Sequence, residues 1–215
     1  SEEERAHILR LAEDLRRRIE ETAEGTGMKA EARVEGSVAK DTWLRGEPDI
    51  DIFLRLPPTL SREALGAIGL EIGRKATRGF KQVERFAEHP YLECFADGVR
   101  VNIVPCYRVE RGRWLSATDR TPFHTDYVKP LLNERLSGEI RLLKRFMKGI
   151  GVYGAEIRIG GFSGYLCELL ILRYESFIET LKSAADWRRQ EIIDLQGYYK
   201  GREKELRKVF NEDFL

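Results

Sequence analysis

The chain has 215 residues, of which 42% are hydrophobic and 34% are charged, and its formal net charge is +1. This apolar content suffices for a real core in one large domain or two small ones, whereas the near-neutral charge excludes a general field for polyanions. The sequence shows no signal peptide, no apolar run of 18 residues and no cysteine spacing typical of disulfides or zinc, which predicts a soluble, cytoplasmic protein with reduced thiols.

The first predicted element is a scaffold helix followed by a strand. Ser1 and Glu4 match a capping box, and apolar residues recur at helical spacing from Ile8 to Ile19. Gly25 ends this helix. Residues 29–35 then alternate in polarity, as the residues of a half-buried strand do.

A glycine-serine turn follows this strand. Gly36 and Ser37 are expected to open a short helix that reaches about Leu44. Backbone N–H groups at such a turn point away from the strand and are available to a phosphate. The turn is therefore a candidate phosphate-binding element.

Two aspartates lie in the next predicted strand, residues 49–56. Because a strand places residues i and i+2 on the same face, Asp49 and Asp51 point together. Two adjacent carboxylates are tolerated where a cation lies between them, and Mg²⁺ prefers oxygen ligands. The strand therefore predicts a metal site; the alternative is that both carboxylates line a solvated strand face.

Further elements complete an α/β domain. Ser61 caps a helix that carries Leu65 and Ile72. Residues 91–96 and 99–104 read as two strands, and the Asp97-Gly98 dipeptide between them is a strong signal for a two-residue hairpin turn. This domain is expected to extend to residue 125 and to end in a loop over residues 108–125.

The second half is predicted to be helical. One helix surrounds Ile140 and ends at Gly149, and a longer helix starts after residues 160–164. The apolar residues expected on the buried side of the longer helix are Leu166, Leu169, Leu170, Phe177, Ile178 and Leu181. The predicted domains are thus residues 1–125, a helical domain at 126–190 and a charged segment at 191–215, whose last part, 197–215, reads as a helix.

The order of turn, helix and aspartate-bearing strand resembles the polymerase β-like nucleotidyltransferases. Longer segments are more specific and resemble the archaeal, class I CCA-adding enzymes: EGSVAKDTWLRG (35–46), HPY (89–91), VNIVPCY (101–107), DRTPFH (119–124), RLLKRF (141–146) and VYGAEIRIGGFSGYLCELLI (152–171). The resemblance runs in order from about residue 30 to about residue 195. It implies an α/β (α+β) palm with a mixed sheet, called the head, followed by a helical neck.

The resemblance also implies a reaction. In that family a tRNA 3′ end attacks the α-phosphate of CTP or ATP and pyrophosphate leaves, with Mg²⁺ held by acidic residues. It therefore implies CCA addition as the function, with ATP and CTP as substrates, Mg²⁺ as cofactor and the tRNA acceptor stem as partner. The oligomeric state is not indicated.

Individual residues take their expected roles from this resemblance. Asp49 and Asp51 match the first two metal-binding and catalytic carboxylates. The positions that match nucleotide contacts are Gly36, Ser37, Lys40, Thr121, His124, Lys144 and Tyr153. Lysines offset phosphate charge, a histidine can donate to phosphate, and a tyrosine can stack on a base. Taken singly, Lys144 is equally typical of a solvated helix, Tyr153 of a core edge and His124 of a loop hydrogen bond.

Asn102 departs from the family pattern, because the third metal-binding carboxylate belongs at this position. Its amide oxygen can coordinate a cation, but it is neutral and a poor proton acceptor. Three explanations stay open: an engineered Asp-to-Asn change, a natural loss of activity, and a substitute carboxylate. Glu93 is the local candidate for the last, since a two-residue turn at Asp97-Gly98 places it directly across from Asn102.

The length is a second departure, since family members are roughly twice as long. The chain is expected to correspond to an N-terminal half without the body and tail domains, with weak tRNA affinity and poor discrimination between C and A. CCA addition impaired by Asn102 and by this shortening is the function predicted for the chain. The alternatives are a non-catalytic nucleotide- or RNA-binding module and a reduced nucleotidyltransferase that acts on another acceptor.

Overall fold

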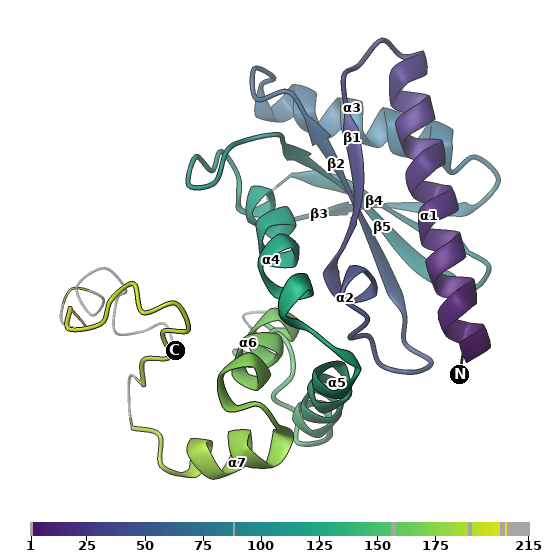
Figure 1. Cartoon of the computed structure of the whole chain (residues 1–215). Helices are drawn as coiled ribbons and strands as arrows, with labels where there is room; N and C mark the ends of the chain where they lie inside the picture. The colour runs from purple at the N-terminus through teal and green to yellow at the C-terminus, as the bar shows by residue number, and fades with distance from the viewer. Residues whose placement is uncertain (1, 88, 156–157, 189–190, 203–204, 206–215) are drawn as a thin grey trace. The chain divides into compact units, whose positions relative to one another are not determined.

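A computed structural model of the chain describes residues 2–87, 89–155, 158–188, 191–202 and 205. The chain divides into two compact units, Ser1–Leu132 and Asn133–Leu215. Figure 1 shows a sheet with helices in the first unit and, among the described residues of the second unit, helices without a strand.

The first unit is built on a five-stranded mixed sheet. Its strand order is β1 (Glu31–Glu35), β2 (Asp49–Leu56), β5 (Val99–Tyr107), β4 (Pro90–Ala96) and β3 (Lys81–Phe86). β2 and β5 run parallel, and the other three neighbouring pairs are antiparallel. The predicted mixed, largely antiparallel palm is thus confirmed.

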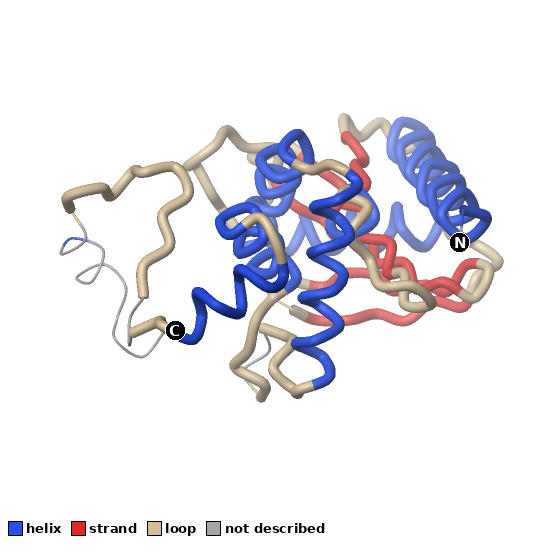
Figure 2. The backbone as a smooth tube through the Cα atoms, turned by 60° about the horizontal axis from the view of Figure 1, so that its bottom comes forward, coloured by secondary structure: helices blue, strands red, loops and turns tan. Residues whose placement is uncertain are grey.

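Alternation along β2 separates a core face from a polar face. Ile50, Ile52 and Leu54 are fully buried, on the face against which α1 (Glu2–Gly25) and α3 (Arg62–Ala76) pack. Figure 2 shows helices in blue beside the red strands of this sheet. Asp49 and Asp51 alternate with these core residues and therefore lie on the opposite face.

Helix α3 approaches the sheet closely because glycines face the strands. A Cβ built on Gly69 would lie 2.6 Å from the side chain of Pro105 in β5. We expect Gly69→Ala to lower the free energy of unfolding by about 1–3 kcal/mol, since the added methyl group overpacks this contact. Gly138, inside a helix of the second unit with nothing within 4 Å of its Cβ position, is the control.

Gly138→Ala is expected to raise the free energy of unfolding by about 0.5–1 kcal/mol, because alanine loses less backbone entropy in a helix. Urea unfolding of both variants, followed by far-UV circular dichroism, measures the difference. Equal effects of the same sign would contradict a steric role for Gly69.

Four expectations for the first unit need correction. The short helix α2 (Gly36–Ala39) ends well before Leu44, because Asp41 adopts a left-handed conformation with φ 54°. Strand β3 was not predicted, since its mostly polar sequence lacks an apolar alternation and it lies at the sheet edge. Strand β5 continues past Val104, and the predicted loop 108–125 contains η1 (Ala117–Arg120) and the start of α4 (Thr121–Val128).

The remaining helices follow in chain order. A short turn of helix, η2 (Lys129–Leu131), ends the first unit. In the second unit, α5 (Glu134–Gly149) confirms the helix expected around Ile140. The single long helix expected after residues 160–164 was wrong: α6 (Gly164–Tyr174) and α7 (Phe177–Ala185) are separate, because Glu175 has φ 66° and Ser176 caps α7.

Burial in the second unit also differs in part from the expectation. Leu170 is buried as expected, whereas Ile178 is 53% exposed and Leu166 lies on the exposed side. The helix predicted over residues 197–215 falls largely outside the described residues; residues 198–201 form a turn.

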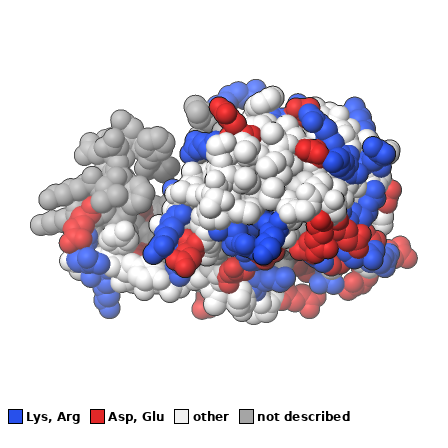
Figure 3. Space-filling model, turned by 90° about the horizontal axis from the view of Figure 1, so that it is seen from above, with Lys and Arg blue, Asp and Glu red and all other residues white. Residues whose placement is uncertain are grey.

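Two surface properties agree with the composition. Among the described residues, no helix combines the length and the apolar character that crossing a membrane requires. On the face drawn in Figure 3, positive and negative side chains are interspersed. Neither sign forms a continuous field on that face.

Candidate active site

A row of polar residues crosses the face of the sheet opposite α1 and α3. Asp51 of β2 lies opposite Glu35 of β1 on one side and opposite Asn102 of β5 on the other, and Asn102 lies opposite Glu93 of β4. Directly paired residues on neighbouring strands share a face. The row confirms the expected position of Glu93, and the turn that produces it is the two-residue turn at Asp97-Gly98.

Asp51 and Asn102 are joined by a hydrogen bond. The Asn102 amide Nδ2 donates to Asp51 Oδ1 at 2.9 Å. Burial raises the pKa of Asp51 to about 6, and the neighbouring Asp49 charge adds to this rise; the Asn102 hydrogen bond opposes it, as do the charges of Arg100 and Lys40. A carboxylate whose ionised form is made unfavourable by burial and by a neighbouring negative charge is typical of a site that binds a cation.

Asp49 pairs with an arginine on the neighbouring strand. Arg100 lies opposite Asp49 in the β2–β5 register, and its Nε donates to Asp49 Oδ1 at 2.8 Å. Its Nη2 donates to Asp49 Oδ2. Both groups are partly exposed, at 48% for the Arg100 side chain and 40% for that of Asp49.

The Gly36 turn lies directly against the Asp51 carboxylate. Gly36 has φ 68°, and a Cβ built on it would lie 2.4 Å from Asp51 Oδ2. Only glycine combines this backbone conformation with so close an approach. Ser37 follows in α2, where its carbonyl accepts from the Thr42 N–H at 2.9 Å, and Lys40 after α2 is buried.

A network of charged residues, of which Glu35 is buried and Asp126 is exposed, ties the turn to α4. Glu35, directly before Gly36, is fully buried, and Arg33 Nε lies 2.8 Å from Glu35 Oε1. Arg33 also donates to Asp126 of α4 through two nitrogens, at 2.5 and 3.2 Å. Burial raises the pKa of Glu35, while Thr125 of α4 and the Arg33 charge lower it.

Helix α4 carries two of the predicted nucleotide contacts. Thr121 is its first residue, and His124 precedes the buried Thr125. Because α4 packs against both β1 and α2, the fold brings these residues and the Gly36 turn into one region of the first unit. This placement follows from the packing of α4 and does not depend on a direct contact between His124 and the turn residues.

Lys144 and Tyr153 belong to the second unit. Lys144 of α5 is buried, and its Nζ lies 3.4 Å from Oε1 of the equally buried Glu168 in α6. A Cβ on Gly164, the first residue of α6, would lie 2.9 Å from Tyr153 Oη and 3.6 Å from Lys144 Nζ. Lys144 and Tyr153, both predicted to contact the nucleotide, therefore lie close together beside the start of α6. Lys144 does not belong to a solvated helix face.

The donor set at the row fits a hard divalent cation. Asp49, Asp51 and Asn102 offer carboxylate and amide oxygens, which Mg²⁺ prefers. Among the described residues, no group of three or more His, Cys, Asp or Glu side chains is arranged to hold a metal ion.

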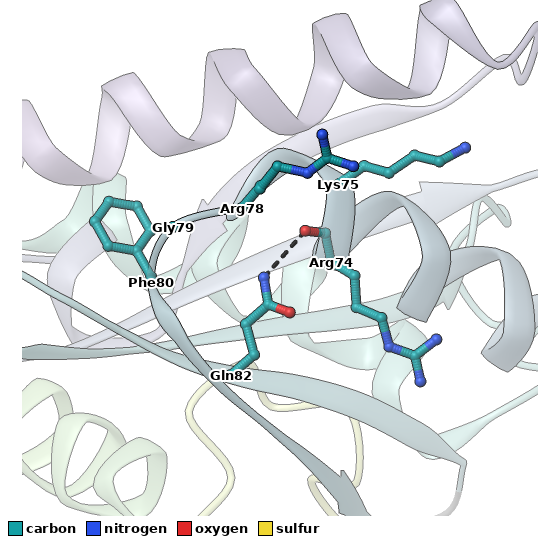
Figure 4. Close-up of a pocket in the computed structure, with 6 residues that line it drawn as sticks. All are labelled: Arg74, Lys75, Arg78, Gly79, Phe80 and Gln82. Atoms are coloured by element: carbon teal, nitrogen blue, oxygen red, sulfur yellow. Dashed lines mark hydrogen bonds between the residues drawn. The ribbon is translucent and has the colours of Figure 1, made fainter.

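A separate hollow lies at the C-terminal end of α3, and Figure 4 shows its side chains. It has a volume of about 310 Å³ and is lined by Arg74, Lys75, Arg78, Gly79, Phe80 and Gln82. Gln82 Nε2 donates to the Arg74 carbonyl oxygen at 3.0 Å. None of the predicted site residues lines it, and Arg74 and Lys75 are engaged by Glu84 and Glu71.

Two features of the site were not predicted. The Arg100–Asp49 pair depends on the adjacency of β2 and β5, which are distant in sequence. The burial of Glu35 depends on α4 covering β1. The sequence did contain a signal for Arg100, because the predicted strand 99–104 places Arg100 on the same face as Asn102.

Comparisons with known proteins begin with two family models. One, described as "Nucleotidyltransferase domain", matches residues 11–128. The other, described as "tRNA nucleotidyltransferase, second domain", matches residues 138–214.

Curated relatives are similar over most of the chain. A CCA-adding enzyme of Methanothermobacter thermautotrophicus is 43% identical over 93% of this chain and 45% of its own length. CCA-adding enzymes of Archaeoglobus fulgidus and Thermococcus gammatolerans are each 45% identical, over 85% and 92% of this chain. The chain spans less than half the length of these relatives.

Solved structures support the fold. The chain is similar to E. coli MS115-1 CdnC with ATP, with a TM-score of 0.65 and 19% identity over 94% of this chain and 73% of that one. A poly(A) polymerase complex, GLD-2 with GLD-3, has a TM-score of 0.58 at 14% identity, over 78% of this chain and 53% of that one.

Proposed function

Because this chain belongs to the nucleotidyltransferase domain family and its curated relatives are archaeal CCA-adding enzymes, we propose that it is the head and neck of such an enzyme, built to add CMP and AMP from CTP and ATP to tRNA 3′ ends. The observation that carries this is the contact of the Gly36 turn with Asp51. It supports the proposal because backbone amides suited to a phosphate then lie beside a carboxylate suited to a metal ion.

The roles of the residues in the first unit follow from this arrangement. The N–H groups of the Gly36-Ser37 turn and the Lys40 charge hold the triphosphate, and Thr121 and His124 of α4 bind it further. Asp49, Asp51 and the Asn102 oxygen would hold Mg²⁺. When bound, that ion neutralises phosphate charge and favours in-line attack by the primer hydroxyl.

Lys144 and Tyr153 of the second unit are the remaining residues proposed to contact the nucleotide. In the proposed domain assignment, residues 1–125 form the head, 126–190 the helical neck and 191–215 a charged C-terminal segment. The tRNA acceptor stem is the proposed partner.

A specific observation favours a second function, a nucleotide- or RNA-binding module without turnover. Asn102 donates its amide hydrogen to Asp51 and adds no negative charge to the row. Such a site binds a nucleotide but activates the attacking hydroxyl weakly. A reduced nucleotidyltransferase acting on another acceptor is the remaining alternative.

Asn102→Asp separates these functions. In this variant we expect incorporation of labelled CTP and ATP into tRNA lacking its CCA end to rise about tenfold or more in Mg²⁺, because a third carboxylate holds the metal and accepts charge. In EDTA the same variant is expected to melt at a lower temperature, since two carboxylates then meet without a cation.

The measurement compares both proteins in incorporation and in ATP and CTP titrations. If both bind nucleotide and neither incorporates it, the part of the relatives that this chain does not span becomes the main explanation. If neither binds nucleotide, the proposed function is wrong.

A further inference from the structure

Arg100 is hydrogen-bonded to the carboxylate of Asp49, which is one of the expected metal ligands. Its guanidinium donates to both oxygens of Asp49, through Nε and Nη2. Bidentate pairing of this kind uses the same lone pairs that would bind a cation. Metal and guanidinium therefore compete for Asp49.

The net charge of the site also indicates that a divalent cation binds there less readily. Asp49 and Asp51 carry the only negative charges among the three expected metal ligands, and Arg100 cancels one of them. Asn102 adds none. The site thus attracts a divalent cation less than a row of three carboxylates with a neutral neighbour would.

We propose that Arg100 is an internal counter-ion for Asp49, which a divalent metal ion has to displace before it binds. This inference rests on the proposed function, because it assumes that Asp49 is a metal ligand. It makes Arg100 a residue that sets the metal concentration at which the site fills.

Displacement is feasible because the pair is not buried. With about half of the Arg100 side chain exposed, water screens the pair and its guanidinium can leave without a large desolvation cost. Removing one positive charge roughly 5 Å from a divalent cation is expected to tighten metal binding about tenfold, even with water-like screening.

The test is titration of the protein with Mn²⁺ alone, followed by calorimetry. Arg100→Gln should bind Mn²⁺ about tenfold more tightly than the unchanged chain. The matched control is Arg74→Gln, because the Arg74–Glu84 pair has nearly the same exposure, 47% and 43%, and lies by the hollow at the end of α3. That control should leave Mn²⁺ affinity unchanged.

Equal Mn²⁺ affinity in Arg100→Gln and the unchanged chain overturns the inference, as does an equal gain in Arg74→Gln. If the unchanged chain binds Mn²⁺ too weakly to measure, the comparison is made in the Asn102→Asp background, where the same tenfold gain is required. Arg100→Lys keeps the charge and loses the bidentate geometry, so it should give a smaller gain in Mn²⁺ affinity. It replaces Arg100→Gln in the comparison if the glutamine variant does not fold.

Failure of the inference is distinguishable from failure of the proposed function. ATP that binds with the same Mn²⁺ requirement in all variants contradicts only the role of Arg100. Absence of both ATP and Mn²⁺ binding, also in the Asn102→Asp background, contradicts the nucleotidyltransferase site itself.

Discussion

Gly36→Ala is expected to lower affinity for ATP about 10- to 100-fold, because the turn has to move to accommodate a methyl group and each hydrogen bond to the charged phosphate that is lost costs about 1.5–3 kcal/mol. The built Cβ would lie 2.4 Å from Asp51 Oδ2, and the backbone has φ 68°. Either the turn moves away from the carboxylates or Asp51 is displaced, and both outcomes separate phosphate-binding from metal-binding groups.

Gly46→Ala is the matched control for Gly36→Ala. Gly46 has φ 73°, almost the same conformation, but nothing lies within 4 Å of its Cβ position. It should therefore show the conformational cost of about 1–2 kcal/mol in stability without the loss of nucleotide affinity. Calorimetric titration of both variants with ATP and Mg²⁺ measures this. Similar affinities in the two would show that the contact with Asp51 does not matter.

Glu168→Ala is expected to lower the free energy of unfolding by about 3–5 kcal/mol, because it leaves the buried Lys144 charge without its carboxylate. The side chains of Lys144 and Glu168 are only 3% and 1% exposed. The expected loss is a large part of the roughly 5–15 kcal/mol by which native proteins are stable, so the second unit should unfold first.

Glu179→Ala in α7 provides the comparison within the same unit. Its pair with Lys182 has exposed fractions of 55% and 67%, and such a pair is worth about 0–1 kcal/mol. Urea unfolding followed by tryptophan fluorescence, with Trp187 beside Tyr174 of α6 as a reporter of the second unit, measures both variants. A loss below about 1 kcal/mol in Glu168→Ala would mean that Lys144 finds another way to lose or screen its charge.

Local patterns in the sequence predicted much of the palm. Strand β2 was recognised because its apolar residues alternate with Asp49 and Asp51, and the hairpin because Asp97-Gly98 is a strong turn signal. The row of Asp51, Asn102 and Glu93 followed from these local rules and from the family resemblance.

The features of the fold and of the candidate site that the sequence did not predict depend on tertiary structure. Strand β3 is held by pairing with β4 and has little apolar pattern of its own. The break between α6 and α7 requires Glu175 to adopt a left-handed conformation, which is unusual for a residue other than glycine. The Arg100–Asp49 pair requires β5 to lie beside β2, and strand order is not a local property of the sequence.

The placement of Asn102 has a genetic consequence. Strand β5 is hydrogen-bonded on both sides, to β2 and to β4, so the backbone at this position is fixed by its neighbours whichever side chain it carries. Codons for asparagine and aspartate differ by a single base. One point mutation can therefore exchange a neutral for an acidic residue at the centre of the candidate site without a change in the strand pairing around it.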